Sequence, residues 1–308
     1  MKNKILCLFT ACLIIFSLFG FSSFAEEGQY MHIIYNDNDE ALSGVTFRLY
    51  YLGTDNNGEL QPDSVFDDYK CNFNISDAEK RKNLALTLEA YALRDNLSCY
   101  SETVTDENGF SDFDGKMLSR GVWLLIADKH IQNEKHYYTE PVIILLPFGE
   151  SNTVVAKPKF RCDEDVSDED VTSIRVIKAW KNDTEESRPE SIEVVLLKDG
   201  APESTVSLSA ADDWQYVWTS LSAKNHWTVA EKNLPEGYKV SVSLTENTFL
   251  ITNEKEPDED VTEPDDDDPM IPETGMLMWP VPYLALMGLL IFIIGFVYYR
   301  RNETKDEA

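Results

Sequence analysis

The sequence is short of basic residues, and this shortage excludes one class of partner. Its 308 residues include 27 Lys and Arg against 55 Asp and Glu, which gives a formal net charge of −28. Nucleic-acid binding depends on basic side chains that displace counterions from phosphates, and the chain has no basic stripe. The composition therefore argues against nucleic acid as a partner and predicts repulsion from anionic surfaces.

Cysteine is scarce as well. Of the five cysteines, Cys7 and Cys12 lie in an N-terminal apolar segment, which leaves Cys71, Cys99 and Cys162. Disulfide-rich secreted domains use dense, even sets of cysteines, so we expect something other than sulfur to staple this fold. A bridge between Cys71 and Cys99 stays open as an alternative.

The sequence also lacks motifs typical of catalytic, metal or phosphate sites. There is no nucleophile elbow, phosphate loop or paired-carboxylate motif, and the histidines show no ligand spacing. We therefore predict a structural or interaction protein that is not an enzyme and needs no cofactor or metal. The four histidines are His32, His130, His136 and His226.

The N-terminus has the features of an export signal. Lys2 and Lys4 precede an apolar run over residues 5–21, and the segment ends at Ser23-Phe24-Ala25. This small-x-small spacing is typical of a signal-peptide cleavage site. We predict a signal peptide over 1–25, with an uncleaved membrane anchor as the alternative.

The C-terminus contains an uncharged stretch, 276–299, that is long enough to cross a bilayer as a helix. Arg300 and Arg301 follow it and predict a cytoplasmic tail over 300–308. A short polar motif stands directly before the stretch. The motif consists of Ile271, Pro272, Glu273, Thr274 and Gly275.

This order of motif, span and basic tail resembles the cell-wall sorting signal of Gram-positive surface proteins, an LPXTG-type motif with Ile in the first position. The resemblance implies that a sortase cleaves between Thr274 and Gly275. The Thr274 carbonyl would then be joined to an amine on peptidoglycan or on a pilin subunit. Insertion into the membrane would be transient, and the secreted protein would end up anchored to the cell wall.

Two acidic segments divide the chain. Residues 254–270 combine acids with three prolines, and charge repulsion and proline stiffness predict an extended stalk. Calcium binding is the alternative for this segment, although no Gly stands where an EF-type loop needs its tight turn. Residues 161–171 predict a linker between a first domain, 26–160, and a second domain, 172–253.

Short runs of β-branched and aromatic residues, divided by turn signals, predict an all-β sandwich for 172–253. Because alternate residues of a strand share a face, Lys178, Glu231 and Asn253 fall on inward faces. Burying a lone charge costs several kcal/mol, so such groups need one another. A buried ion pair beside an amide would also account for the pattern, as would solvent exposure of all three residues at the strand ends. The apolar residues of matching parity are Ile174, Val176, Trp180, Trp227, Val229, Phe249 and Ile251.

The segments "VIKAWKND", "RPESIEVVLLKDG", "WTVAEKNLPEGY" and "FLITN" resemble the Cna B-type domain of Gram-positive adhesins and pilins, over nearly all of 172–253. The resemblance implies a spontaneous isopeptide bond between Lys178 and Asn253, with Glu231 as the proton shuttle. Desolvation lowers the pKa of a lysine and raises that of a carboxyl group, so a neutral amine would attack the amide and release ammonia. This single-turnover self-modification does not make the chain an enzyme.

The first domain, 26–160, contains "ALSGVTFRLYYLG", "TVTDENGFSDFDG" and "RGVWLLIAD", which resemble a more divergent Cna B-like or transthyretin-like sandwich. Asn108-Gly109 predicts a hairpin turn. Helical spacing over 77–96 predicts one helix packed on this sandwich, with a binding groove as the alternative use of its apolar stripe. The predicted fold is thus two tandem Ig-like sandwiches, an inserted helix and a C-terminal transmembrane helix. The stripe consists of Ala78, Arg81, Leu84 or Ala85, Leu88 and Ala92.

The first domain departs from the cross-linking pattern. Its first strand reads "MHIIYNDN" without lysine, and Ala127 stands where the acid belongs, so we predict no isopeptide bond there. Asp128 would replace the acid only if the register slipped by one residue. The segment "TVVAKPKF" resembles the pilin motif whose lysine accepts the next subunit, which makes Lys159 the candidate acceptor. Lys157 replaces the usual Tyr, and a solvated linker lysine is the alternative.

Together these features predict a sortase-anchored Gram-positive surface protein, either a minor or basal pilin or a short wall-attached stalk. A wall-anchored adhesin outside a pilus, with a host surface ligand, is the alternative. A surface hydrolase with its active site in the first domain is a further one. The sequence leaves open the host ligand, the sortase class and polymerisation into pili.

Overall fold

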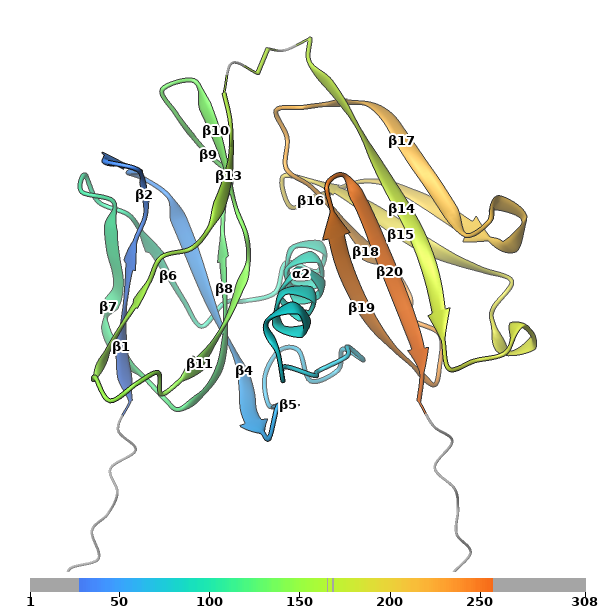
Figure 1. Cartoon of the computed structure of the whole chain (residues 1–308), viewed down its shortest axis with the longest axis horizontal. Coiled ribbons are helices and arrows are strands. Elements are labelled where there is room, and N and C mark those ends of the chain that lie inside the picture. The colour runs from blue at the N-terminus through green and yellow to red at the C-terminus, as the bar shows by residue number, and fades with distance from the viewer. Residues whose placement is uncertain (1–27, 165, 168, 257–308) are drawn as a thin grey trace, which may run out of the picture. The chain divides into compact units, whose positions relative to one another are not determined.

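The computed structural model describes residues 28–164, 166–167 and 169–256, which are mostly β-strand with one α-helix (Figure 1). The predicted signal peptide, sorting motif, membrane span and tail lie outside the described residues. Among the residues described, no helix is both long and apolar enough to cross a membrane. The predicted stalk also lies outside, except that Glu254 and Lys255 belong to the last strand and Glu256 follows it.

The first part of the chain forms three main sheets and a small hairpin. The sheets have the strand orders β12-β1-β7, β13-β10-β9 and β11-β8-β4-β5, with β6 paired to β4 and β2 to β3. The strands are β1 (Gln29–Ile34), β2 (Asn36–Asp37), β3 (Glu40–Ala41), β4 (Thr46–Asn56), β5 (Glu59–Pro62), β6 (Ser101–Val104), β7 (Phe110–Leu118), β8 (Gly121–Ala127), β9 (His130–Gln132), β10 (Lys135–Thr139), β11 (Val142–Leu146), β12 (Thr153–Ala156) and β13 (Phe160–Asp163).

Strand β8 is buried on both faces. Its residues form a continuous apolar run, which is typical of a strand covered on both sides. Trp123 and Leu125 belong to the core inside the first part, whereas Val122 and Leu124 belong to a second core. The second core continues into the second part of the chain, so one strand connects two hydrophobic layers.

Helix α2 (Ala78–Arg94) confirms the predicted helix and begins where Asp77 accepts a hydrogen bond from the Lys80 amide at 2.9 Å. The predicted apolar stripe on one side of the helix covers fewer positions than the structure buries. Residues along most of the C-terminal half of α2 are buried, because the helix contacts β11 of the first part and strands of the second part (Figure 1). The buried positions are Leu84, Ala85, Thr87, Leu88, Glu89, Ala90, Tyr91 and Ala92.

The second part of the chain is a two-sheet sandwich with the strand orders β17-β14-β20-β19 and β16-β15-β18. Strand β14 and the last strand, β20, are parallel neighbours. Asp199 and Gly200 have φ angles of 47° and 85°, as the predicted turn between two paired strands requires. The strands are β14 (Val171–Lys181), β15 (Ser191–Lys198), β16 (Ala201–Ser209), β17 (Gln215–Ser222), β18 (Trp227–Glu231), β19 (Tyr238–Thr245) and β20 (Thr248–Lys255), with short 3₁₀ helices η1 (Glu185–Ser187) and η2 (Ala210–Asp212).

The turn at Asn108-Gly109 exists, but the predicted hairpin does not. Gly109 has a φ of 71°, and the Asp106 carboxylate accepts hydrogen bonds from the Asn108 and Phe110 amides at 2.8 and 3.0 Å. The two strands that the turn joins lie in different sheets, because β6 pairs with β4 and β7 pairs with β1. A turn signal in the sequence predicts the local backbone conformation, whereas the packing of the core determines which strands pair.

Both ends of the predicted linker are strand residues, since β13 ends at Asp163 and β14 begins at Val171. The described residues belong to one compact unit, and the domain limits stay a prediction. The thiols of Cys71, Cys99 and Cys162 are free. The structure therefore has no Cys71–Cys99 bridge.

Candidate cross-linking site

Lys178, Glu231 and Asn253 are buried, with exposed fractions of 4%, 1% and 0%. Lys178 lies on β14 and Asn253 on the neighbouring strand β20, whereas Glu231 lies at the end of β18 in the facing sheet. The predicted inward faces are thus confirmed. The alternative of solvent-exposed strand ends is wrong, because all three side chains are buried.

An acid and an amide are joined directly at this site. Asn253 Nδ2 donates a hydrogen bond to Glu231 Oε1 at 3.0 Å. Glu231 Oε2 and Asn253 Oδ1 are buried and have no hydrogen-bond partner within the described residues. Leaving a buried acceptor unpaired costs about 1–3 kcal/mol. Two unpaired acceptors in one site therefore lower the stability of the folded state and call for a functional explanation.

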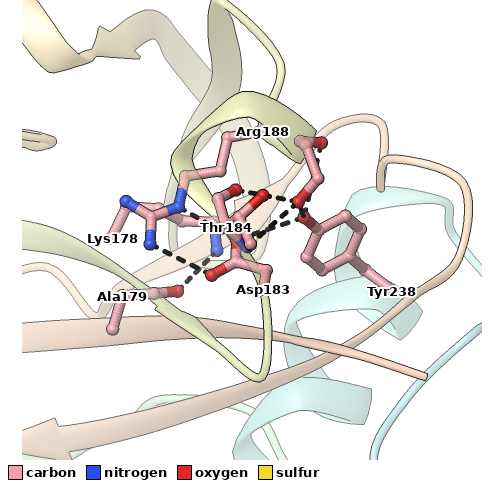
Figure 2. A network of polar contacts seen from close by, with 7 residues as sticks. Lys178, Ala179, Asp183, Thr184, Arg188 and Tyr238 are labelled. Carbon is pink, nitrogen blue, oxygen red and sulfur yellow. Dashed lines mark hydrogen bonds and ion pairs between the residues drawn. The ribbon is translucent and has the colours of Figure 1, made fainter. Parts of the chain in front are cut away.

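Lys178 lies on the strand next to Asn253, and its amine interacts electrostatically with the Glu231 carboxylate. Its Nζ donates a hydrogen bond to the backbone oxygen of Ala179 at 2.9 Å (Figure 2). The same Nζ lies 4.0 Å from the centroid of the Trp180 ring. The parallel register sets Lys178 opposite Ile251 and Trp180 opposite Asn253. Asn253 is therefore the diagonal neighbour of Lys178 on the adjacent strand, on the same inward face.

Burial shifts both ionisable groups toward their neutral forms. Desolvation lowers the pKa of Lys178 to about 7, against the opposing attraction of the Glu231 carboxylate. Desolvation raises the pKa of Glu231 to about 7, against the attraction of Lys178 and the hydrogen bond from Asn253. Near neutral pH, the pair therefore populates a neutral amine beside a protonated acid.

A polar network on the loop after β14 lies next to the lysine (Figure 2). Asp183 accepts two hydrogen bonds from Arg188, at 2.9 and 3.0 Å, and one from the Tyr238 hydroxyl at 3.1 Å. The carboxylate of Asp183 favours the charged form of Lys178, and the Arg188 guanidinium opposes it. Sequence reasoning missed this network, because an irregular loop has no periodicity that predicts which side chains meet.

The arrangement supplies what an amine–amide exchange requires. An amine, an amide and an acid are buried in one core, so folding raises their effective concentration. The desolvated surroundings keep the amine nucleophilic and the acid able to donate a proton.

The remaining predicted residues lie elsewhere. Lys159 is exposed between β12 and β13, and its backbone oxygen accepts a hydrogen bond from the Glu140 amide at 2.9 Å. Asp128 follows β8 and binds Arg48 through two hydrogen bonds of 2.6 and 2.8 Å. Residues 271–275 lie outside the described residues. In the described ranges, no group of three or more His, Cys, Asp or Glu residues could hold a metal ion.

In a comparison with protein families, residues 174–254 match the Cna protein B-type domain. No curated protein matches the chain. The matched segment contains all three residues of the candidate cross-link.

Several solved structures are similar to the chain. A single B repeat unit of the collagen-binding surface protein of Staphylococcus aureus is 18% identical, covering 75% of this chain and 98% of its own, with a TM-score of 0.27. The shaft pilin spaA of Lactobacillus rhamnosus GG is 13% identical, with coverages of 75% and 98% and a TM-score of 0.26. The full-length RrgB pilus protein of Streptococcus pneumoniae is 9% identical, with coverages of 75% and 66% and a TM-score of 0.25. The domain assignment rests on the family match: residues 174–254 of this chain form a Cna protein B-type domain.

Proposed function

We propose that this chain is a pilin-like structural protein of a Gram-positive cell surface, and that an isopeptide bond between Lys178 and Asn253 locks its Cna B-type domain. The observation that carries the proposal is the buried hydrogen bond from the Asn253 amide to Glu231, together with the desolvated Lys178 amine on the neighbouring strand, which interacts electrostatically with Glu231. The family match of 174–254 supports the same function.

The reaction follows from these contacts. The neutral Nζ of Lys178 attacks Cγ of Asn253, and the proton of Glu231 moves to the amide oxygen as its negative charge develops. The attacking nitrogen returns a proton to the Glu231 carboxylate. Glu231 passes this proton to Nδ2, the Cγ–Nδ2 bond breaks, and ammonia leaves. The hydroxyl proton then returns to Glu231 as the Cγ carbonyl re-forms, so the new Nζ–Cγ amide is neutral and Glu231 is protonated as at the start. The hydrogen bond between Nδ2 and Glu231 already joins the leaving nitrogen to its proton source.

The bond would act as the staple that cysteine does not supply. It closes a loop of roughly 75 residues between strands β14 and β20, for which the chain-entropy relation of disulfides suggests about 4–5 kcal/mol. Because these parallel strands are adjacent, tension that enters at the start of β14 and leaves at the end of β20 would pass through the bond and largely bypass the sandwich.

Anchoring to the cell wall is part of the same proposal. Sortase would cleave the motif 271–275 after Thr274 and join the chain to peptidoglycan or to a pilin subunit, after a transient stay of 276–299 in the membrane. The exposure of Lys159 is compatible with its role as an acceptor of the next subunit. A ladder of high-mass forms in wall extracts that disappears in Lys159→Ala would support that role, and a persisting ladder would place the acceptor elsewhere.

The test of the cross-link is the intact mass of residues 28–256. We expect a mass about 17 Da below the sequence value, which corresponds to one ammonia. A tryptic peptide that joins the Lys178 and Asn253 segments must accompany this loss, because asparagine cyclisation also releases ammonia. The variants Lys178→Met and Glu231→Gln are the controls and should keep the full mass. A wild-type chain of unchanged mass would contradict the proposal.

A further inference from the structure

The strand that carries Glu231 is an edge strand whose outer face is covered by the first part of the chain. Strand β18 ends the order β16-β15-β18, yet all five of its residues are buried. Helix α2 contacts β18, and Ala230 belongs to the hydrophobic core that contains Leu88 and Tyr91 of the helix. The first part of the chain therefore supplies a layer that the second sandwich lacks.

Arg94, at the end of α2, is bonded to the backbone of Glu231 itself. Its Nη1 donates to the Glu231 carbonyl oxygen and, at 3.3 Å, to that of Lys232. Asp95 fixes the guanidinium through hydrogen bonds of 2.8 and 2.6 Å, and the group lies 4.5 Å from the centroid of the Tyr91 ring. Glu231 is the last residue of an edge strand, and such strand ends fray easily. Here Arg94 fixes the backbone of Glu231, and Asp95 in turn fixes Arg94.

Neighbouring contacts extend this support to the edge strand of the other sheet. The hydroxyl of Thr87 accepts a hydrogen bond from the Val242 amide of β19 at 2.8 Å. The Val240 amide donates to the Lys70 oxygen at 2.9 Å, and the Asn72 amide donates to the Val240 oxygen at 2.8 Å. The helix and the segment before it thus attach to both edges of the sandwich beside the cross-linking site.

We propose that Arg94 is a positioning residue for the cross-link, so that the reaction site of the second sandwich is completed by the first part of the chain. This inference rests on the proposed function. Arg94 touches none of the reacting atoms and acts by fixing the backbone that carries the Glu231 carboxyl group. Since a misplacement of about 1 Å can slow a positioned reaction by about 100-fold, a loosened β18 terminus should slow bond formation.

The test follows bond formation in residues 28–256 after a pulse of synthesis, with the cross-linked fraction read from intact mass. We expect Arg94→Met to form the bond at least tenfold more slowly than the wild type, and Arg94→Lys, which keeps one donor, to recover part of the rate. Lys129→Met is the matched control. Lys129 also joins the two parts, through Asp199 and the Lys224 oxygen at 3.0 Å each, but it binds residues away from the cross-linking site.

The outcomes separate the two ideas. A wild-type chain that never loses ammonia would contradict the proposed function. A wild type that cross-links while Arg94→Met does so at the same rate would overturn only the role of Arg94. Equal slowing in Lys129→Met would also overturn it, because general loosening would then explain the result. Circular dichroism at the assay temperature checks that each variant is folded. If Arg94→Met does not fold, the rate of Arg94→Lys still decides the test.

A separate observation concerns a cavity of about 500 Å³ that α2 lines together with residues from both parts of the chain. One face of the helix runs from Lys82, which is exposed, through the half-buried Leu86 to Glu89, which is 1% exposed. Glu89 Oε2 has no hydrogen-bond partner within the described residues. An unpaired carboxyl group in a cavity wall is costly to bury, and a cationic ligand would remove that cost.

The other charges around the cavity are already paired or peripheral. Lys82 lies 3.8 Å from Glu140, and Arg161 lies 3.1 Å from Asp163. Burial, followed by repulsion from Arg161, lowers the pKa of His226 to about 4, so its ring is neutral at pH 7. Glu246 is exposed at the rim. The remaining unpaired charges on the lining are therefore acidic, and the apolar part of the lining includes Trp227 and Phe249.

We infer that the cavity binds an aliphatic primary ammonium group, with the Glu89 carboxylate as its counter-ion and the apolar wall around its carbon chain. The ammonium could come from a free amine or from a lysine side chain of a polypeptide, since both present the same chemistry.

Calorimetric titration of residues 28–256 with n-pentylamine and with Nα-acetyl-lysine amide tests this inference. Burial raises the pKa of Glu89 to about 8, so binding at pH 7 should release a proton, and affinity should rise from pH 6 to pH 9. Glu89→Gln should abolish the proton release and weaken binding at least tenfold, whereas the rim variant Glu140→Gln should retain both. Tighter binding of the lysine amide would assign a polypeptide source, and equal binding a free amine. No binding, or unchanged binding to Glu89→Gln, would overturn the inference.

Discussion

The two parts of the chain are stabilised in different ways. In the first part, strand β8 is buried on both faces and contributes to two hydrophobic cores. In the second part, strand β14 alternates between buried and exposed residues and places a lysine in its inward row. The first part thus has apolar layers on both sides of its central sheet, whereas the second has one apolar interior and a reactive polar cluster within it. The proposed bond between Lys178 and Asn253 would add stability to the part of the chain that has one apolar interior.

The largest expected effect is the loss of the lock. Glu231→Gln should keep the full mass of residues 28–256 and lose about 4–5 kcal/mol of unfolding free energy, because the loop between β14 and β20 is no longer closed. For a chain of this size, the melting temperature should fall by roughly 10–20 °C. Calorimetry alongside intact mass checks both results. Equal thermal stability with and without the bond would remove its structural role.

A slightly smaller effect is expected from the core that the two parts share. Leu124 on β8 is fully buried in this core, so Leu124→Ala should cost about 2–5 kcal/mol through lost burial and a residual cavity. Because the core continues into the second sandwich, both parts should melt at a lower temperature. The exposed residue Val155 on β12 provides the control, and Val155→Ala should change stability by less than about 0.5 kcal/mol. A shift confined to the first part would contradict a shared core.

The pH dependence of an unlinked chain gives an intermediate effect with a defined sign. Asn253→Ala keeps Lys178 and Glu231 but cannot form the bond. The lowered pKa of Lys178 means that between pH 7 and 10.5 the unfolded chain binds more protons, so stability rises with pH. The raised pKa of Glu231 means that between pH 4.5 and 7 the folded chain binds more protons, so stability falls as pH rises.

The free energy of unfolding of Asn253→Ala should therefore be lowest near pH 7. The proposed bond would make the Lys178 nitrogen of the wild type an amide that no longer titrates, so the rise on the alkaline side should be absent there. Denaturant titrations from pH 5 to pH 10 measure both profiles. Parallel profiles for the two proteins would contradict a desolvated amine at Lys178.

The smallest effect is expected from the charged pair of the first part. Arg48 and Asp128 form two short hydrogen bonds, but their side chains are 27% and 45% exposed. Partly exposed pairs contribute about 0–1 kcal/mol, so Arg48→Met should lower the free energy of unfolding by no more than about 1 kcal/mol. Chemical denaturation measures this change. A loss comparable to that of Glu231→Gln would mean that the first part also depends on a polar lock.

Strand parity was sufficient to predict that Lys178, Glu231 and Asn253 are buried, because each shares the face of apolar residues two and four positions before it in its strand. Helical spacing likewise predicted α2. Parity could not predict that β8 serves two cores or that α2 lies against both parts of the chain, since such burial depends on which distant layer covers the second face. Arg94 was missed for the same reason. In the sequence it is one basic residue at the end of a helix, and only the packing brings it to the Glu231 carbonyl.

The most direct test of the central claim is the fragment spectrum of the tryptic peptide that contains Lys178. The account predicts a branched peptide in which the Lys178 nitrogen is joined to the side chain of Asn253, with a mass about 17 Da below the sum of the two linear peptides. Separate, unmodified peptides containing Lys178 and Asn253, recovered from a folded chain in full yield, would contradict it.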